Sequence, residues 1–176
     1  VIVDGYQGHI LLSPLEAIRN EYKRLIAEDA ELNARYLQEI SLPSRSLCGA
    51  SFSLMVNSGL AVELETTKAE HTDGVGLYRT EFPFIMRDSF PTEQEQTELY
   101  RKILAGYPAK PVVMRTLDVG GDKALPYFVI NEENPFLGWR GIRLTLDHPE
   151  IFLVQIRAML KANLGLNNLH ILLPMI

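Results

Sequence analysis

Residues 111–123 read PVVMRTLDVGGDK, an apolar run that ends abruptly in charged residues and glycines. The run from Pro111 to Met114 predicts a buried β-strand, with Arg115 at the point where that strand stops. Earlier in the chain, residues 74–81 read GVGLYRTE, a second short apolar strand that ends at Arg79. In parallel α/β folds ligands bind at the carboxyl ends of strands, so both arginines are expected at one edge of a sheet.

Two guanidinium groups at neighbouring strand ends predict a site for a doubly charged anion. Each guanidinium offers a planar fork of donors that matches phosphate or carboxylate oxygens. The glycines at 120–121 would let the backbone approach a ligand closely. Lys123 could add a third cation, and Asp118 could orient Arg115 or Lys123. The alternative is structural: each arginine would pair with Glu81 or Asp118 and only brace the rim of the sheet.

The composition narrows the class of protein. The chain has 176 residues, of which 47% are hydrophobic and 22% charged, as in globular proteins. A net charge of −5 argues against a nucleic-acid-binding surface, and no apolar run approaches the length of a membrane span. The one cysteine, Cys48, fits a reducing compartment, so a cytoplasmic protein is expected. The four histidines are scattered and show no metal-ligand spacing.

The first 43 residues predict a hairpin followed by a linker helix. Residues 1–12 alternate weakly around a turn and are typical of a hairpin. Ser13 to Glu16 reads as a helix start, with Ser13 as the cap and Glu16 completing a capping box. The helix is expected to run to about Glu39 and to be ended by Pro43. Its narrow apolar stripe is typical of a surface linker helix, and a partner-binding helix is the alternative.

From Cys48 onward the pattern alternates between strands and helices. The expected strands are 52–56, 75–78, 112–114 and 169–173, and the expected helices run from Ala61 to about His71, from Pro91 past Leu104, and from Pro149 to just before Gly165. Four strands alternating with three helices predict a parallel sheet with right-handed crossovers.

Two α/β architectures are compatible with this alternation: an open doubly wound sheet, and the first half of a (β/α)8 TIM-type barrel. Residues 57–60, NSGL, do not form the glycine fingerprint that nucleotide-binding open sheets carry after their first strand. Chemistry on several successive strand ends is typical of a barrel, and four βα units account for half of its roughly 250 residues. The sequence therefore predicts a half-barrel over 44–176, truncated after its fourth strand.

The segment 131–143, NEENPFLGWRGIR, is the other notable feature. Long loops after barrel strands are usually functional, and Phe136, Trp139, Arg140 and Arg143 could fold over the site and exclude water. The alternative is a self-packed excursion at the rim with Trp139 as its small core.

Three motifs together resemble a known family. GLYRTE at 76–81, RTLDVGGDK at 115–123 and ENPFLGWRGIR at 133–143 are similar to the phosphoenolpyruvate-utilising enzymes, and within them to the phosphoenolpyruvate–protein phosphotransferases, enzyme I of the bacterial phosphotransferase system. Residues 1–5, 57–60 and 172–176 resemble the nitrogen-related branch of that group.

The resemblance implies a reaction and a set of site residues. Phosphoenolpyruvate would bind with Mg²⁺ at the mouth of a (β/α)8 barrel and phosphorylate a histidine on a swivelling domain, which passes the group to a histidine phosphocarrier protein. Arg79 and Arg115 match the phosphate-binding arginines, and Lys123 and Arg140 match further residues around the substrate, with Asp118 beside them. Residues 1–12 would be the tail of the swivelling domain, joined by the linker helix at 13–43.

The same resemblance implies that the chain holds only part of the machinery. The phosphorylated histidine would lie before Val1, and the acidic Mg²⁺ ligands, a further arginine and the general-acid cysteine beyond Ile176. Cys48 precedes the first barrel strand and does not match that cysteine. We therefore expect residues 1–176 alone to transfer no phosphoryl group, and the complete protein to be a homodimer.

Two rival interpretations stay open on the sequence. One is a non-catalytic regulatory or docking module built around the helix at 13–40. The other is a fragment of a related enzyme, a pyruvate phosphate dikinase or a phosphoenolpyruvate synthase.

Overall fold

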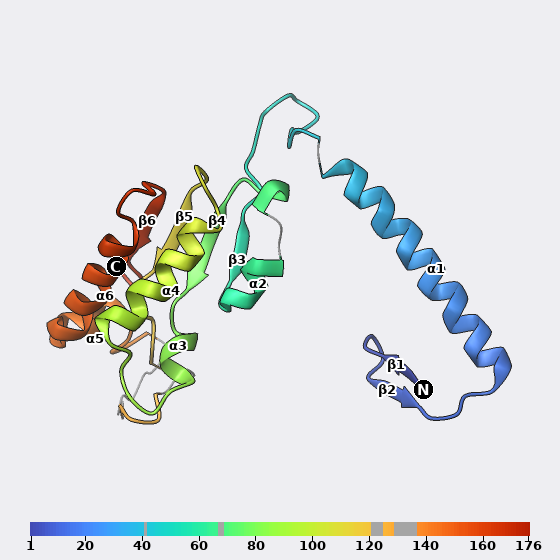
Figure 1. The fold of residues 1–176 in the computed structure, drawn as a ribbon, viewed down its shortest axis with the longest axis horizontal. Coiled ribbons are helices and arrows are strands. Elements are labelled where there is room, and N and C mark those ends of the chain that lie inside the picture. Colours follow the sequence, from blue (N-terminus) through green and yellow to red (C-terminus); the bar gives the residue numbers. More distant parts are fainter. Residues whose placement is uncertain (41, 67–68, 121–124, 129–136) are drawn as a thin grey trace. The chain divides into compact units, whose positions relative to one another are not determined.

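A computed structural model describes residues 1–40, 42–66, 69–120, 125–128 and 137–176. The chain divides into two compact units, Val1–Arg45 and Ser46–Ile176, and each is described by itself (Figure 1).

The first unit contains the predicted hairpin and the long helix. Strands β1 (Ile2–Asp4) and β2 (His9–Leu11) pair antiparallel. Helix α1 spans Glu16–Glu39 and carries no buried residue. The predicted capping by Ser13 is wrong: Leu15 occupies the N-cap position and no side chain caps the helix. Ser13 has a left-handed backbone, with φ of 47°, whereas a capping serine needs an extended backbone.

The second unit is built on a four-stranded parallel sheet. Its strands are β3 (Val56–Ser58), β4 (Val75–Arg79), β5 (Val112–Arg115) and β6 (Leu169–Leu172), which lie side by side in chain order (Figure 1). The prediction of a parallel α/β sheet is therefore confirmed.

The first predicted strand is misplaced, because strand β3 begins only where the expected strand ends, at Val56. The backbone N–H of Leu54 donates to the side chain of Asp73 at 2.7 Å rather than to a neighbouring strand. Phe52 and Leu54 remain exposed, so their alternation does not reflect one buried face of a sheet.

Six short and long helical segments accompany the described sheet. They are α2 (Ala61–Thr66), the 3-10 helix η1 (Ala69–His71), α3 (Phe82–Ile85), α4 (Glu93–Ala105), α5 (Ile142–Asp147) and α6 (Pro149–Ala162). Helix α4 begins as predicted, with Thr92 and Glu95 forming a complete capping box. Of the helix expected from Ala61 to His71, the described residues form α2 and the 3-10 helix η1. Helices α3 and α5 were not predicted from the sequence.

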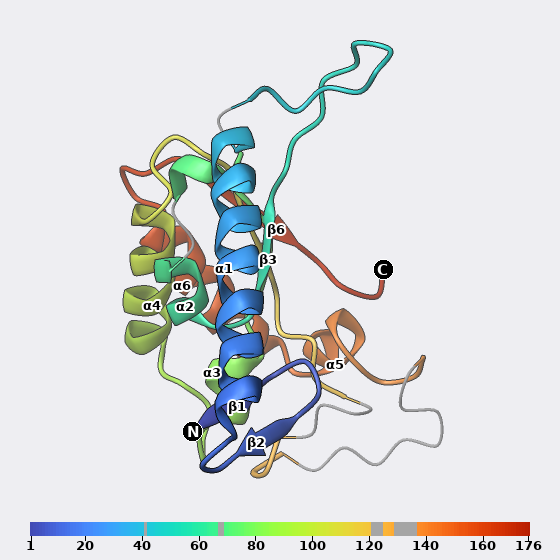
Figure 2. The same ribbon diagram turned by 90° about the vertical axis from the view of Figure 1, so that its right-hand side faces the viewer.

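Helices α4 and α6 pack on one side of the sheet (Figure 2). Their apolar side chains and those of the central strands form the main core, which includes Val75, Tyr78, Tyr100, Leu104, Val112, Met114, Ala158 and Met159. In β5, Val112 and Met114 are buried in this core. Side chains alternate along a strand, so Arg115 lies on the face opposite the helices.

Candidate functional site

Arg79 and Arg115 are the last residues of neighbouring strands and are paired in register. Each follows a fully buried core residue, Tyr78 or Met114, so both side chains belong to the sheet face opposite the helices. The predicted adjacency of the two arginines at the carboxyl ends of parallel strands is therefore present in the fold.

Carboxylates surround Arg115. Its Nη2 contacts Glu81 Oε1, and its Nη1 lies 3.1 Å from Asp118 Oδ2. The side chains of Arg115, Glu81 and Asp118 are only 16%, 1% and 7% exposed, so water screens these ion pairs weakly. Arg115 thus makes the bracing ion pairs that the structural alternative predicted. Of the two partners predicted for Asp118, Arg115 and Lys123, the contact with Arg115 is present.

Arg140 joins the same carboxylate. Its Nη2 lies 3.2 Å from Asp118 Oδ2, and its Nε donates to Asp118 Oδ1 at 3.2 Å. One carboxylate therefore holds two guanidinium groups that are separated by 25 positions in the sequence. Gly120 makes this possible: its φ is +128°, and a Cβ there would lie 2.5 Å from the Cβ of Arg140. Gly120 was predicted to let the backbone approach a ligand closely; in the structure the residue that a side chain there would meet is Arg140.

Arg79 has a different environment. Its guanidinium carbon lies 5.6 Å from the centre of the Phe82 ring, the geometry of a cation–π contact. Within the described residues, the buried Nε atoms of Arg79 and Arg115 both lack hydrogen-bond partners. Buried polar groups are almost always hydrogen-bonded, so these two Nε atoms mark places where a hydrogen-bond acceptor would be favourable.

Glu63 contributes a carboxylate that sequence reasoning missed. Its Oε2 accepts a hydrogen bond from the Ser58 hydroxyl at 2.6 Å and from the backbone N–H groups of Gly59 and Leu60 at 3.3 Å. The Ser58 hydrogen bond is the main reason that the pKa of Glu63 is below its usual range, with the two backbone donors and the charge of Arg79 adding to it. No capping-box spacing in the sequence pointed to this contact.

Gln155 is the second residue that the sequence did not single out. It lies on α6, is fully buried, and hydrogen-bonds to Thr80 at 3.1 Å and to the backbone N–H of Leu117 at 2.8 Å. Both partners are within two residues of the paired arginines.

Two predicted features are only partly described. Lys123 lies outside the described residues, as does the part of the loop up to 136 that includes Phe136. In the described remainder, Trp139 packs against Phe128 and His148, with ring centroids 6.3 and 5.6 Å away. Arg143 donates to the carbonyl oxygen of Leu137. These contacts are those of the self-packed alternative rather than of a cover over the arginines.

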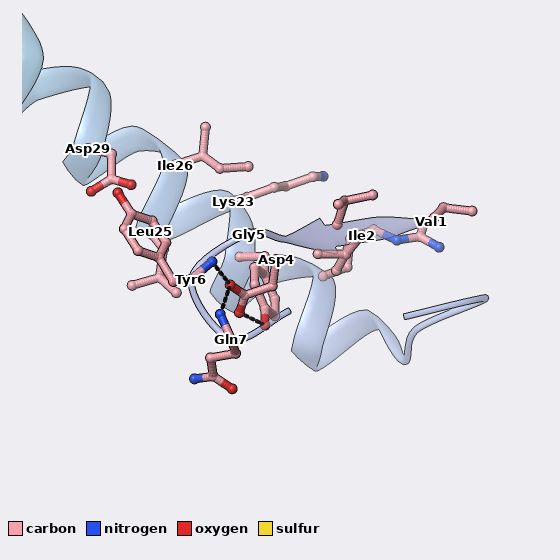
Figure 3. A pocket seen from close by; sticks show the side chains of 13 residues that line it. Val1, Ile2, Asp4, Gly5, Tyr6, Gln7, Lys23, Leu25, Ile26 and Asp29 are labelled. Carbon is pink, nitrogen blue, oxygen red and sulfur yellow. Dashed lines mark hydrogen bonds between the residues drawn. The ribbon is translucent and has the colours of Figure 1, made fainter. Parts of the chain in front are cut away.

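Two of the described cavities lie away from the arginines. One of about 530 Å³ lies within the first unit between the hairpin and α1, where Figure 3 shows Asp4 accepting hydrogen bonds from Tyr6 and Gln7. Another of about 280 Å³ is lined by residues 84–96 and the start of α6. Neither is lined by a residue predicted to bind an anion.

The described part of the chain contains no group of three or more histidine, cysteine or acidic side chains that could hold a metal ion. Of the helices described, none is both long and apolar enough to cross a membrane.

Comparisons with known proteins all find proteins described by their use of phosphoenolpyruvate. A family model described as "PEP-utilising enzyme, PEP-binding domain" matches residues 34–176. The whole chain is 51% identical to a protein of Escherichia coli named "Phosphoenolpyruvate-dependent phosphotransferase system", of which it covers 24%, and as similar to its counterpart in Salmonella typhimurium. It is 42% identical to the "Phosphoenolpyruvate-protein phosphotransferase" of Listeria innocua, of which it covers 31%. The chain thus spans only 24% to 31% of the length of these relatives.

Proposed function

The chain belongs to the phosphoenolpyruvate-utilising enzyme family, matching its PEP-binding domain, and we propose that its strand-end arginines supply part of a phosphoenolpyruvate site. The observation that carries the proposal is the register pairing of Arg79 with Arg115 at the carboxyl ends of β4 and β5. Arg140 joins them through Asp118, and Lys123 is proposed as a further cation beside the substrate.

The chemistry of the site suits phosphoryl transfer. When a phosphoryl group leaves an enolate, negative charge spreads over its oxygens, and cations already in place stabilise that charge without reorganising. The neighbouring carboxylates Glu81 and Asp118 hold Arg115 in a fixed position before a substrate arrives. The unpartnered Nε atoms of the two arginines are groups that an oxyanion could satisfy.

The proposed reaction follows the names of the relatives. The complete protein would move the phosphoryl group of phosphoenolpyruvate to one of its own histidines and on to a histidine phosphocarrier protein, as a cytoplasmic homodimer. Mg²⁺ would assist in the complete enzyme. The described residues do not form a cluster that fits this ion.

The proposed architecture is the first half of a (β/α)8 barrel over residues 44–176. The strand order β3-β4-β5-β6 follows the chain without a reversal, and every neighbouring pair is parallel, as in a barrel. Residues 1–12 and 13–43 would be the tail of the swivelling domain and the linker.

The test replaces each paired arginine with alanine in the complete protein that contains residues 1–176. Phosphoenolpyruvate-dependent phosphorylation should fall by about 100-fold or more for Arg79→Ala and for Arg115→Ala, because each change removes a preplaced cation from the transferred group. Arg157→Ala, which removes an exposed arginine of α6, is the control and should leave the rate nearly unchanged.

The same assay separates the rival functions. Unchanged phosphorylation in both arginine variants would favour a docking module built around α1, whose apolar side chains are all at least partly exposed. A strict requirement for a nucleotide would instead favour a dikinase or a synthase. Residues 1–176 alone should incorporate no phosphoryl group from phosphoenolpyruvate.

A further inference from the structure

One buried side-chain amide forms hydrogen bonds to the segments that follow β4 and β5, the two strands that end in Arg79 and Arg115. Gln155, on α6, is 0% exposed and uses its whole amide group. Its Oε1 accepts a hydrogen bond from the backbone N–H of Leu117 at 2.8 Å. Its Nε2 donates to the hydroxyl of Thr80 and to that of Tyr100, both at 3.1 Å. A fully satisfied buried amide of this kind fixes the positions of its partners.

The partners of Gln155 adjoin the arginines directly. Thr80 follows Arg79, and its hydroxyl donates to the backbone carbonyl of Arg115 at 2.8 Å. Leu117 lies between Arg115 and Asp118 in the sequence. The Gln155 side chain therefore hydrogen-bonds directly to the backbone after β5. Through Thr80 it also fixes the position of the end of β4 relative to Arg115, the last residue of β5.

The direction of the hydrogen bonds allows one arrangement of the amide. Tyr100 donates to Gln96 Oε1 at 3.1 Å, and Gln96 in turn donates to the carbonyl of Pro91 at 2.9 Å. Tyr100 must then accept from Gln155. If the amide were reversed, its NH₂ group would face the N–H of Leu117, leaving two donors opposed. Burial also raises the pKa of Tyr100 well above its usual value, so its hydroxyl stays protonated.

We propose that Gln155 is a positioning residue, which sets the spacing of Arg79 and Arg115 by holding both strand ends on one buried amide. The proposal rests on the proposed function, in which these arginines bind the phosphate of phosphoenolpyruvate. Positioning matters for the rate because a displacement of about 1 Å far from the chemistry can lower it on the order of 100-fold.

The first test compares two buried amides in the complete protein. Gln155→Met keeps the length of the side chain and removes all three hydrogen bonds, two to the segments after β4 and β5 and one to Tyr100 on α4. Asn168→Leu is the matched control. Asn168 is also buried, and its amide donates to the carbonyls of Leu104, Tyr107 and Lys110, but it precedes β6 at the amino end of the sheet. Both variants lose stability, so stability alone cannot separate them.

The two variants should differ in catalysis. Gln155→Met should lower kcat/KM for phosphoenolpyruvate by about 10- to 100-fold relative to Asn168→Leu, with circular dichroism showing that both are folded. Equal kcat/KM values for the two folded variants would overturn the positioning role. If the arginine variants also kept full activity, the proposed function itself would fail, so the two failures are distinguishable.

A second variant covers the case in which Gln155→Met does not fold. Gln155→Glu keeps the shape of the side chain, and only its protonated form can donate a hydrogen bond to Thr80 or Tyr100. Burial disfavours the charged form of such a carboxyl group, so its pKa should be raised. Activity of this variant should therefore recover as the pH falls and be lost as the pH rises, unlike that of the original protein. A pH profile parallel to that of the original protein would contradict the proposal.

Discussion

At the scale of single residues, the charge balance of the strand ends depends on Asp118. Its carboxylate lies 3.1 Å from Arg115 and 3.2 Å from Arg140, and its side chain is 7% exposed. Two guanidinium groups this close repel each other unless an anion lies between them. Asp118 supplies that anion in the described structure, and in the proposed function the substrate phosphate would share the same cations.

The substitution Asp118→Asn tests this balance. It should lower the free energy of unfolding by about 3 kcal/mol, because it leaves two largely buried guanidinium groups without their shared carboxylate. Inorganic phosphate should raise the Tm of the variant more than that of the original chain, since the anion can replace the lost charge. Urea denaturation and thermal melts with and without phosphate measure both effects.

The control for this change is Asp88→Asn, which alters the same charge at an exposed position. It should change the unfolding free energy by less than about 0.5 kcal/mol. A similarly small loss in Asp118→Asn would show that the carboxylate does not brace the two arginines.

At the scale of elements, the start of α4 combines a capping box with an ion pair. Arg87 donates to Glu95 at 2.6 Å, and the backbone N–H and hydroxyl of Thr92 both donate to the same carboxylate at 2.8 Å. These hydrogen bonds lower the pKa of Glu95 to about 2. The one from Arg87 contributes most, followed by those from Thr92. Glu95 therefore favours the folded state only while its carboxyl group is ionised.

This pKa predicts a pH dependence of stability. A lowered pKa in the folded state contributes stability that is present above the ordinary value of 4.5 and is lost as the pH falls towards 2. The Glu95→Gln variant should thus have a lower free energy of unfolding than the original chain at pH 7. This difference in unfolding free energy should shrink between about pH 5 and pH 2. Denaturation curves at several pH values measure the difference. Glu98→Gln on the same helix is the control, and an equal narrowing there would refute the assignment to Glu95.

The elements show which parts of the fold the sequence could predict. The strands β4, β5 and β6 and the capped start of α4 follow from short local patterns, and each is present. The strand expected at 52–56 failed because alternation alone cannot reveal whether a neighbouring strand is available for pairing. Helices α3 and α5 have four and six residues, too few for a hydrophobic period to be visible.

The candidate site divides in the same way. Arg79 and Arg115 were predictable because each follows directly on an apolar run. Gln155 was not, because its partners Thr80 and Leu117 are 75 and 38 positions away in the sequence and no local pattern marks the contact. Glu63 was missed because its environment depends on the turn after β3. Residues that support a site from another helix or strand can be identified only in the three-dimensional structure.

At the scale of the whole molecule, the described sheet has two open edges. β3 and β6 each pair with one strand, so each presents unpaired backbone groups on its outer side. Ile171 in β6 is 36% exposed, and Met55 beside β3 is 41% exposed. In the proposed barrel further strands would cover these edges, whereas an exposed apolar edge is a template for pairing with another chain.

Residues 1–176 produced alone should therefore self-associate. Light scattering should give a mass above the 19.9 kDa of one chain, and the mass should rise with concentration. Ile171→Lys should reduce the association, because a charged side chain on an edge strand opposes pairing. A concentration-independent mass of one chain would contradict the prediction.

The length of helix α1 and its lack of buried side chains determine how it can transmit motion. At about 1.5 Å per residue, its 24 residues form a rod of about 36 Å. No packed core stiffens this rod, since it buries no side chain, and ion pairs one turn apart, such as Arg24 with Glu28 and Arg35 with Glu31, support it along its surface. Such a rod works as a lever, in which a tilt of roughly 10° at one end moves the other by roughly 6 Å. Its stiffness should soften as ionic strength rises and these surface charges are screened.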